Sequence, residues 1–397
     1  MLIDVDTVQR IQNAAILVVD DLDFNIKILV QSLRSSGFSN IQTAKNGGEA
    51  LSITQQNTPD IVILDLMMPK VDGFEYCRQI RADRHYDNMP IVVQTALSDN
   101  EKKLTAFKLG ANDYICKPFE ASELSARVKV HLNQKFILEK LRRYQQQMQS
   151  ELESARKIQN RLLPSPHQVK ICERVYDMKI GHHFETTSDL GGDYWGIWPL
   201  SEERLAIFMF DFSGRGISTA MNVFRMHTFI QESLHNHSEP GYLLDKLNQK
   251  LLNTINRDEL ATMFYGVIDT EANCLLYASA ASPTGLLFKP GQNTVRLPSS
   301  GFPLGIKPDA QYKTHYIPFL PDDLLVLHSD CISETQNSKG EFLADSQIEG
   351  AILQALRELP AHPANAVVES LCNLLKSHNP APVFDDNTIT VYHRKPE

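Results

Sequence analysis

Five short apolar runs, each followed by an amphipathic stretch, alternate along the first third of the chain, from Ala14 to about Leu132. The runs read AAILVVDD, IQTAK, DIVILDL, MPIVVQTA and NDYICKP. This alternation predicts a five-stranded parallel sheet with helices on both faces, an α/β fold. Because the carboxyl ends of parallel strands meet at one edge of the sheet, side chains placed there can act together.

Aspartates, a threonine and a lysine stand at those strand ends. Asp20 and Asp21 end the first run, Asp65 ends the third, Thr95 lies in the fourth, and Lys117 closes the fifth. The set suits phosphoryl transfer to a carboxylate, with Asp65 as nucleophile and the other two aspartates holding Mg²⁺. Lys117 supplies a fixed positive charge and Thr95 a hydroxyl donor. A single aspartate at a strand end is more often a helix cap or a surface charge, but five matching residues are hard to explain in that way.

The segments VVDD, LDLMMPKVDG, VVQTA, KLGANDYI and CKPF resemble the receiver domain of response regulators, and we place that domain at residues 14–133. The resemblance implies a flavodoxin-like fold in which Asp65 is the phospho-acceptor. It also implies that Met67 offers its backbone carbonyl to the Mg²⁺ and that Tyr114 is the switch aromatic. The implied partner is a histidine kinase or phosphotransfer protein. A receiver that keeps these residues but is never phosphorylated is the alternative.

A segment without glycine follows, from Gln134 to Leu163. Its apolar residues recur about every three and a half positions, the step of a coiled-coil seam, at Ile137, Leu141, Tyr144, Met148, Leu152, Ala155, Ile158 and Leu162. The pattern predicts a helical, coiled-coil-like linker over 134–163. The helix either pairs with its copy in a homodimer or packs along its own domain, and we favour the dimer.

Beyond Pro164 the pattern changes to strand-like runs separated by turn residues, which read RLAIFMFDF, MFYGVID, CLLYASA, DLLVLHSD and NTITVYHR. Helical stretches are predicted near 217–235, 240–257 and 346–378. Strands gathered together and flanked by helices indicate an α+β domain with antiparallel sheets. We place this second domain at residues 164–397.

Four aspartates of the second domain each lie beside a strand and a turn: Asp193 in LGGDYW, Asp211 in FMFDFSGRG, Asp330 in VLHSDCISET and Asp385 in VFDDNT. Carboxylates gathered from distant segments repel one another unless cations neutralise them. A centre of two Mg²⁺ or Mn²⁺ ions would do so, and such centres activate water for attack on a phosphate monoester. The alternative is that the aspartates cap turns in a domain that kept its fold and lost its metals.

The segments SARKIQNRLLP, GGDYW, DFSGRG, ATMFYGVID, GFPLGI, HSDCISET and DDNT resemble the PPM family of metal-dependent serine/threonine protein phosphatases, in its SpoIIE/RsbU-like bacterial branch. The resemblance implies a PPM sandwich in which Asp211 bridges two Mn²⁺ or Mg²⁺ ions. Asp330 and Asp385 would ligate one ion, Asp193 would contact the cluster through water, and the Phe212 carbonyl would face a metal. The implied substrate is a phosphorylated STAS-type anti-sigma-factor antagonist, as part of a stress response.

The second resemblance has departures. Cys331 follows Asp330 where the family has glycine, Gly196 replaces an acidic residue, Arg215 replaces a histidine, and residues 278–285 lack the usual asparagine and histidine. If the glycine position requires a positive φ, a cysteine there costs about 1 kcal/mol. Because no implied metal ligand is lost, we predict an active hydrolase. The competing hypothesis is a non-enzymatic adaptor, with a degenerate phosphatase domain that binds or sequesters a sigma-factor regulator under receiver control.

Composition excludes other classes. A formal charge of −9 and a pI near 5.8 disfavour a nucleic-acid surface, and no basic recognition helix follows the first domain as in a transcription factor. The six cysteines are scattered without a Cys-x-x-Cys pair, which disfavours disulfides and thiolate zinc sites. The sequence contains no apolar run of membrane-spanning length and no signal-peptide pattern, so we expect a cytoplasmic protein without a membrane partner.

Overall fold

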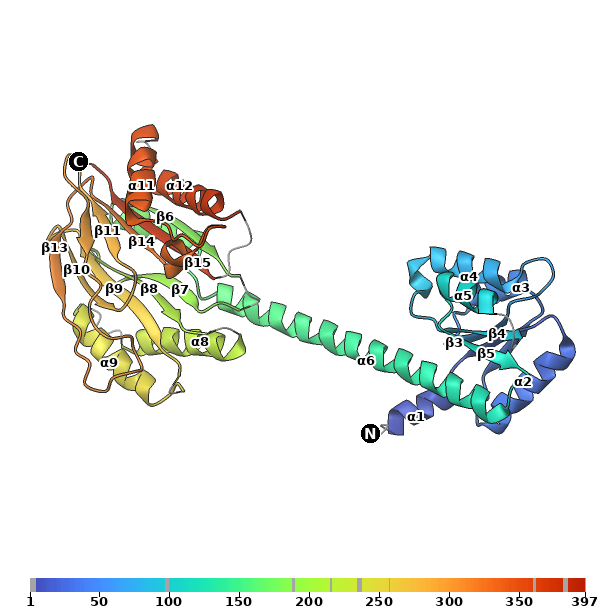
Figure 1. Cartoon of the computed structure of the whole chain (residues 1–397). Helices are drawn as coiled ribbons and strands as arrows, with labels where there is room; N and C mark the ends of the chain where they lie inside the picture. The colour runs from blue at the N-terminus through green and yellow to red at the C-terminus, as the bar shows by residue number, and fades with distance from the viewer. Residues whose placement is uncertain are drawn as a thin grey trace. The chain divides into compact units, whose positions relative to one another are not determined.

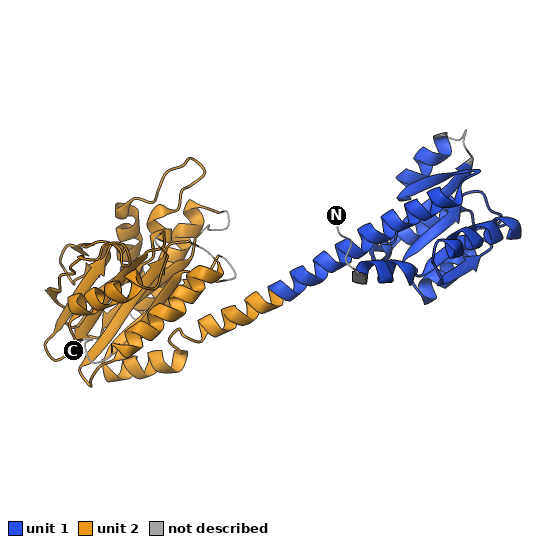
Figure 2. Cartoon of the chain, turned by 90° about the horizontal axis from the view of Figure 1, so that it is seen from below, with its two compact units in different colours: residues 1–148 blue, residues 149–397 orange. Residues whose placement is uncertain are grey.

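The computed structural model describes residues 5–96, 100–187, 190–214, 216–233, 238–256, 258–359, 362–380 and 385–396. The chain divides into two compact units, residues 1–148 and residues 149–397 (Figure 2). Each unit has its own sheets and its own apolar core, and each is described by itself below.

The first unit is a parallel five-stranded sheet in the order β2-β1-β3-β4-β5 (Figure 1). Its strands are β1 (Ile16–Val19), β2 (Ile41–Ala44), β3 (Ile61–Asp65), β4 (Ile91–Ala96) and β5 (Asp113–Lys117). The apolar residues of β1 and β3 are completely buried, as expected for central strands covered on both faces. The predicted α/β fold is confirmed.

Helices cover both faces of this sheet: α1 (Val5–Gln12), α2 (Asp23–Ser35), α3 (Gly47–Gln56), α4 (Gly73–Ala82), α5 (Asn100–Lys108) and the start of α6 (Ala121–Asn160), with a short 3₁₀ turn, η1, at Arg84–Tyr86. One apolar core lies between the sheet and α3, α4 and α5, and the other between the sheet and α1, α2 and α6. Asn46 and Asp72 cap α3 and α4 by accepting a hydrogen bond from a backbone N–H of the first turn.

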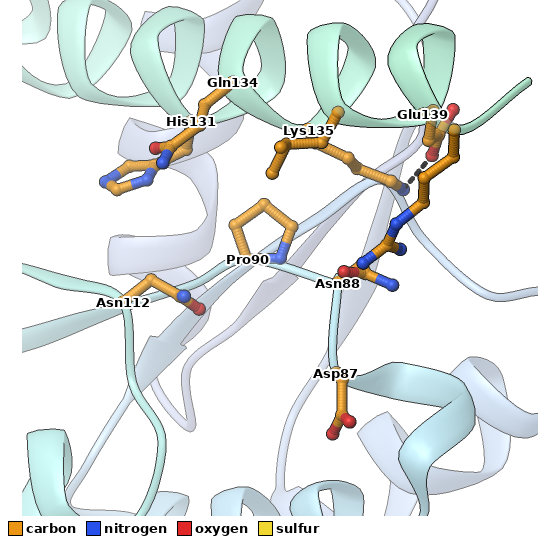
Figure 3. Close-up of a pocket in the computed structure, with 10 residues that line it drawn as sticks. Asp87, Asn88, Pro90, Asn112, His131, Gln134, Lys135 and Glu139 are labelled. Atoms are coloured by element: carbon orange, nitrogen blue, oxygen red, sulfur yellow. Dashed lines mark ion pairs between the residues drawn. The ribbon is translucent and has the colours of Figure 1, made fainter. Parts of the chain in front are cut away.

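Helix α6 is 40 residues long and begins inside the first unit. Leu124, Val128 and Leu132 on its first turns are buried in the core. Beyond them, Lys135 pairs with Asp60 at 2.7 Å, next to a cavity of about 120 Å³. Figure 3 shows Lys135 and its neighbours on this face of α6, facing the segment that contains Pro90. The residues predicted to act chemically lie elsewhere, so we regard this contact as the attachment of α6 to its unit.

The second unit contains two antiparallel sheets of five strands. The first has the order β13-β10-β9-β8-β7, and the second has the order β12-β11-β14-β15-β6. Their strands are β6 (Met178–Glu185), β7 (Asp193–Pro199), β8 (Arg204–Phe212), β9 (Ala261–Asp269), β10 (Cys274–Ala280), β11 (Gly285–Phe288), β12 (Val295–Leu297), β13 (His315–Pro318), β14 (Leu324–His328) and β15 (Asn387–Arg394).

The two sheets pack face to face, and helices cover their outer faces. Side chains from both sheets, such as Trp195 and Leu327, form a central core. Helices α8 (Ile217–Glu232) and α9 (Pro240–Leu252) pack on the first sheet, and α11 (Asp345–Glu358) and α12 (Pro363–His378) pack on the second. Figure 1 shows these helices on opposite sides of the sandwich. The short helices α7 (Pro166–Val175) and α10 (Asp330–Glu334) complete the unit.

The helical stretch expected near 346–378 is two helices, because Pro363 starts α12 at a first-turn position where its missing N–H is tolerated. The predicted α+β sandwich is otherwise confirmed. Within the described ranges of the chain, every helix is too short or too polar to cross a bilayer, α6 included.

Two candidate acidic sites

Three aspartates meet at the carboxyl edge of the sheet in the first unit. One oxygen from each of Asp20, Asp21 and Asp65 lies within 4.8 Å of the other two. Asp20 is fully buried and the other two are half-buried. The arrangement follows from the sheet, because β1 and β3 are neighbours and end at the same level. Hard divalent cations prefer clustered carboxylate oxygens, so these residues fit a Mg²⁺ ion.

Lys117 provides a positive charge within this cluster. Its Nζ lies 2.9 Å from an oxygen of Asp20 and 2.6 Å from an oxygen of Asp65. Burial raises the pKa of Asp65, and the hydrogen bond and charge of Lys117 offset part of that rise. Asn25, which we did not predict, donates to both oxygens of Asp20 at 3.0 Å.

The other predicted residues of this unit lie around the cluster. The backbone N–H of Met67 donates to Asp65 at 3.3 Å, which places this residue beside the acceptor. Thr95 is buried on β4, in register with Cys116 of β5, the residue before Lys117. Tyr114 lies apart from the carboxylates, against α5, where its ring makes an edge contact with Phe107 at 5.9 Å between centroids.

The second unit brings together four aspartates from separate segments. Asp193 starts β7 and is in register with Asp211 on β8. Asp330 starts α10 directly after β14, and it lines one small cavity together with the first two. Asp385 lies just before β15 and, together with Asp330, lines a larger cavity of about 530 Å³.

This second set is more open than the first. In the part of the chain that the structure describes, only the cluster of Asp20, Asp21 and Asp65 has three acidic, histidine or cysteine groups within 4.8 Å of one another. Within the set, Asp193 and Asp211 are joined by a side-chain hydrogen bond. Carboxylate oxygens spread over a larger space can hold two cations, because the two ions of a binuclear metal centre are about 3.5–4 Å apart.

The raised pKa values of the four-aspartate set indicate that its carboxylates lack a neutralising positive charge. Burial raises the pKa of Asp211 to about 8, and the charges of Asp330, Asp385 and Asp386 add to the rise. Burial and the charge of Asp385 raise the pKa of Asp330 to about 6. Burial and the charge of Asp211 raise the pKa of Asp193 well above its ordinary value, although Thr388 donates a hydrogen bond to it at 2.6 Å. The donor set therefore fits divalent cations.

Asp386 holds the loop that carries Asp193. It is buried, and its carboxylate accepts from the backbone N–H groups of Thr187 at 3.0 Å and Gly192 at 2.8 Å. The loop approaches so closely that a Cβ on Gly192 would lie 2.6 Å from the Phe212 carbonyl oxygen. The packing beside Asp193 therefore requires glycine at position 192, and the Phe212 carbonyl oxygen lies next to it.

Two family models match the chain, and each match lies within one of the two units. The model for the response regulator receiver domain matches residues 16–129, and the model for stage II sporulation protein E (SpoIIE) matches residues 201–395. The chain therefore contains a response regulator receiver domain and, after it, a SpoIIE-type PPM domain.

Relatives of each half agree with this assignment. The receiver half is 39% identical over 125 residues to the transcriptional regulatory protein YvrH of Bacillus subtilis, covering 32% of this chain and 52% of YvrH. It is 35% identical over 130 residues to the response regulator PleD of Caulobacter vibrioides, covering 33% of this chain and 28% of PleD. The chain spans about half or less of the length of these relatives.

The PPM domain has the fold of the SiaA-PP2C domain of Pseudomonas aeruginosa, with a TM-score of 0.54 and 17% identity. The match covers 63% of this chain and 98% of that domain. This likeness shows the fold alone.

The departures from the PPM pattern have structural explanations. Cys331 is buried in α10 and is not among the residues with positive φ, so the strain considered from the sequence does not arise. A Cβ on Gly196 would lie 2.2 Å from the Phe208 ring, so the ring fills the space that an acidic side chain would need. Ser279 and Ser282, in the segment that lacks asparagine and histidine, pair at 2.9 Å. Arg215 lies outside the described residues.

Proposed function

We propose that the chain is a two-component response regulator in which phosphorylation of Asp65 controls a metal-dependent phosphoserine and phosphothreonine protein phosphatase. Residues 14–133 would be the receiver, 134–163 the linker and 164–397 the phosphatase. The observation that carries the proposal is the convergence of Asp193, Asp211, Asp330 and Asp385 on adjoining cavities of a PPM fold.

In the receiver, a carboxylate oxygen of Asp65 attacks the phosphorus of a phosphohistidine on a kinase or phosphotransfer protein. The P–N bond breaks, the histidine leaves with its electron pair, and Asp65 becomes an acyl phosphate. Lys117, which already contacts Asp65 at 2.6 Å, can then pair with the phosphoryl oxygens. Asp20, Asp21 and the Met67 carbonyl would hold Mg²⁺, and Thr95 would donate its hydroxyl to the phosphoryl group. Tyr114 would be the switch aromatic.

In the phosphatase, Asp211 would bridge two cations, Asp330 and Asp385 would hold one of them, and the Phe212 carbonyl would face a cation. Asp193 would orient a water molecule toward the centre, with its carboxylate fixed by Thr388. When bound, two Mn²⁺ or Mg²⁺ ions supply an acidified water nucleophile and neutralise the phosphate oxygens. The products are inorganic phosphate and a free serine or threonine hydroxyl.

The substrate that we favour is a phosphorylated STAS-type anti-sigma-factor antagonist. Support comes from the resemblance of the motifs to the SpoIIE/RsbU-like branch, which implies such a substrate, and from the match to the SpoIIE family model. A non-enzymatic adaptor that binds such a regulator is the alternative. It is weakened because Cys331 and Gly196 fit without strain and because the four aspartates line adjoining cavities.

The middle of α6 supports the homodimer proposed from its heptad pattern. Large apolar side chains on this stretch are exposed, among them Leu141 and Tyr144 at 60% and Met148 at 57%. Pairing with a second copy would bury them. Light scattering should give twice the mass of 44.9 kDa at micromolar concentration, and Leu141→Glu should halve it. A monomer mass for wild type, with and without phosphorylation, would rule the dimer out.

Phosphate release from a phosphoserine-bearing STAS protein tests the activity. We expect turnover that requires Mn²⁺ or Mg²⁺ and is lost in Asp211→Ala. No turnover with several such substrates, together with no metal binding by calorimetry, would favour the adaptor.

A further inference from the structure

One buried amide in the first unit is left without a partner. Gln94 lies on β4 and is completely buried, and both its Nε2 and its Oε1 lack a hydrogen-bond partner in the part of the chain that the structure describes. Buried polar side chains are nearly always paired, because an amide that is removed from water and gains no partner destabilises the fold. The unpaired amide therefore needs an explanation.

The packing of the sheet does not supply that explanation. Side chains alternate along a strand, so Gln94 shares its face with Val92, which belongs to the core between the sheet and α1, α2 and α6. Its neighbours in register are Asp65 on β3 and Ile115 on β5, and Ile115 belongs to the same core. An apolar side chain would fit this face of the sheet, so the fold itself does not require an amide at position 94.

Gln94 also lines a cavity of about 420 Å³. The other described lining residues are Asn25 and Ile28 on α2, Lys117 at the end of β5, and Pro118 and Phe119 after it. Of these six residues only Gln94 is buried, so its amide lies at the inner wall. A single water molecule needs about 10–15 Å³, whereas small-molecule sites measure about 300–1,000 Å³. The cavity therefore has the size of a small-molecule site.

The remaining lining residues indicate the chemistry of an occupant. Its apolar lining residues are Ile28, Pro118 and Phe119. Lys117 is the only cation among the described lining residues, and its Nζ already pairs with Asp20 and Asp65. Its methylene groups, and not its charge, are therefore left for an occupant. An ionic ligand would lose water without gaining a counter-charge, whereas a neutral ring would pack on the apolar side chains.

We propose that this cavity binds a small, neutral, planar ligand that carries a hydrogen-bond donor beside an acceptor, as a nucleobase or an aromatic carboxamide does. The Oε1 of Gln94 accepts from the donor of the ligand, and its Nε2 donates to the acceptor, in the two-bond pairing that glutamine makes with adenine. The ring packs against Ile28 and Phe119. This site uses no metal aspartate and does not depend on the proposed phosphatase activity.

Ligand-observed NMR titrations of the full chain test the site with three probes, adenine, uracil and benzamide, each of which carries a donor beside an acceptor. One variant is Gln94→Met, which keeps the size of the side chain and removes both polar groups. Its control is Gln56→Met, at an exposed position of α3. A second variant, Ile28→Trp, narrows the cavity at a residue that is 41% exposed and leaves Gln94 in place.

We expect at least one probe to bind wild type and Gln56→Met with a Kd of about 1 mM or tighter, as ligands of this size allow. Binding should weaken by at least about tenfold in Gln94→Met, because two hydrogen bonds are lost, and also in Ile28→Trp. Without ligand, Gln94→Met should melt at a higher temperature than wild type, since an apolar side chain replaces an unpaired amide.

The proposal would be overturned if none of the three probes binds, or if a probe binds Gln94→Met or Ile28→Trp as tightly as wild type. A lower melting temperature for Gln94→Met would show that the amide stabilises the fold through ordered water, and it would contradict a ligand site as well. If the chain hydrolyses no phosphoprotein, the proposed activity fails, but these titrations still decide whether the cavity is a binding site.

Discussion

The two acidic sites of this chain differ in how the negative charge of their carboxylates is balanced. In the receiver, three carboxylates approach within 4.8 Å, and Lys117 lies among them at 2.6 and 2.9 Å from two of them. In the PPM domain, no three of the four described aspartates come that close, and burial and the neighbouring negative charges raise the pKa of Asp211 to about 8.

The difference indicates what each site needs from its cations. The receiver site carries part of its own neutralising charge in Lys117. In the PPM site, burial and neighbouring charges raise the pKa values of Asp193, Asp211 and Asp330, so we expect divalent cations to displace protons there. Metal binding should therefore change the ionisation and stability of the PPM domain much more than those of the receiver.

The largest expected effect comes from Asp211→Asn. Phosphate release should fall by about a hundredfold or more, since the variant lacks the residue that we propose would bridge the two cations. At the same time the metal-free protein should become more stable at pH 8, because one repelling charge is removed from a buried cluster. Thermal unfolding in a chelator measures the second effect, with the exposed Asp309→Asn as control. A destabilised Asp211→Asn would mean that repulsion does not dominate this site.

Lys117→Met should make the receiver site resemble the PPM site. We expect the metal-free receiver to lose about 2 kcal/mol, less than for a fully buried pair because the Lys117 side chain is 30% exposed. Mg²⁺ should then raise the melting temperature of the variant more than that of wild type. Differential scanning calorimetry checks this, with Lys108→Met on the surface of α5 as control. An equal rise in melting temperature with Mg²⁺ in the variant and in wild type would contradict the proposed difference between the receiver site and the PPM site.

The pH dependence of the melting temperature tests the charge balance of the PPM site without a mutation. The pKa values of Asp330 and Asp211 are raised to about 6 and about 8, so the folded metal-free PPM domain binds protons that the unfolded chain releases. Stability from these protons is present at low pH and lost as pH rises through 6 to 8. The metal-free melting temperature should fall over this range, and Mn²⁺ should raise it more at pH 8 than at pH 6. A slope that Asp211→Asn leaves unchanged would assign the effect to other groups.

The smallest effect is expected for Thr388→Val, which removes the hydroxyl that donates to Asp193 at 2.6 Å and keeps the shape of the side chain. Loss of one hydrogen bond to a charged group should weaken Mn²⁺ binding by roughly tenfold. Calorimetric titration measures the affinity, and Thr390→Val, two residues later on β15, is the matched control. Equal affinities for the two variants would show that Asp193 does not depend on this hydroxyl.

The sequence predicted the fold through patterns that are local. Alternating runs gave the parallel sheet, because each run forms one strand, with the central strands buried and the edge strands β2 and β5 partly exposed. The sequence did not show that the linker belongs to a helix that begins inside the receiver. Leu124 and Val128 of α6 are buried in the receiver core, whereas Leu141 and Tyr144 on the same helix are exposed. The hydrophobic pattern of the sequence does not change at the residue where the helix leaves the core and becomes the linker.

The site was predicted only in part for a related reason. The aspartates could be found because each stands in its own short motif. Only the fold shows that the carboxylate of Asp386, the neighbour of Asp385, accepts from the N–H of Gly192, 194 positions away in sequence. Likewise, Asn25 and Gln159 are ordinary polar residues of helices until the fold brings Asp20 and Gly191 beside them. Such partners follow from packing, which local motifs do not encode.

The most direct test of the central claim is phosphate release by the full chain before and after phosphorylation of Asp65, with the substrate and Mn²⁺ held constant. We predict that the rate changes at least about fivefold, the lower end of common coupling strengths, and that Asp65→Asn abolishes the change. A rate that is the same with and without the acyl phosphate, in a chain whose receiver is fully phosphorylated, would contradict control of the phosphatase by the receiver.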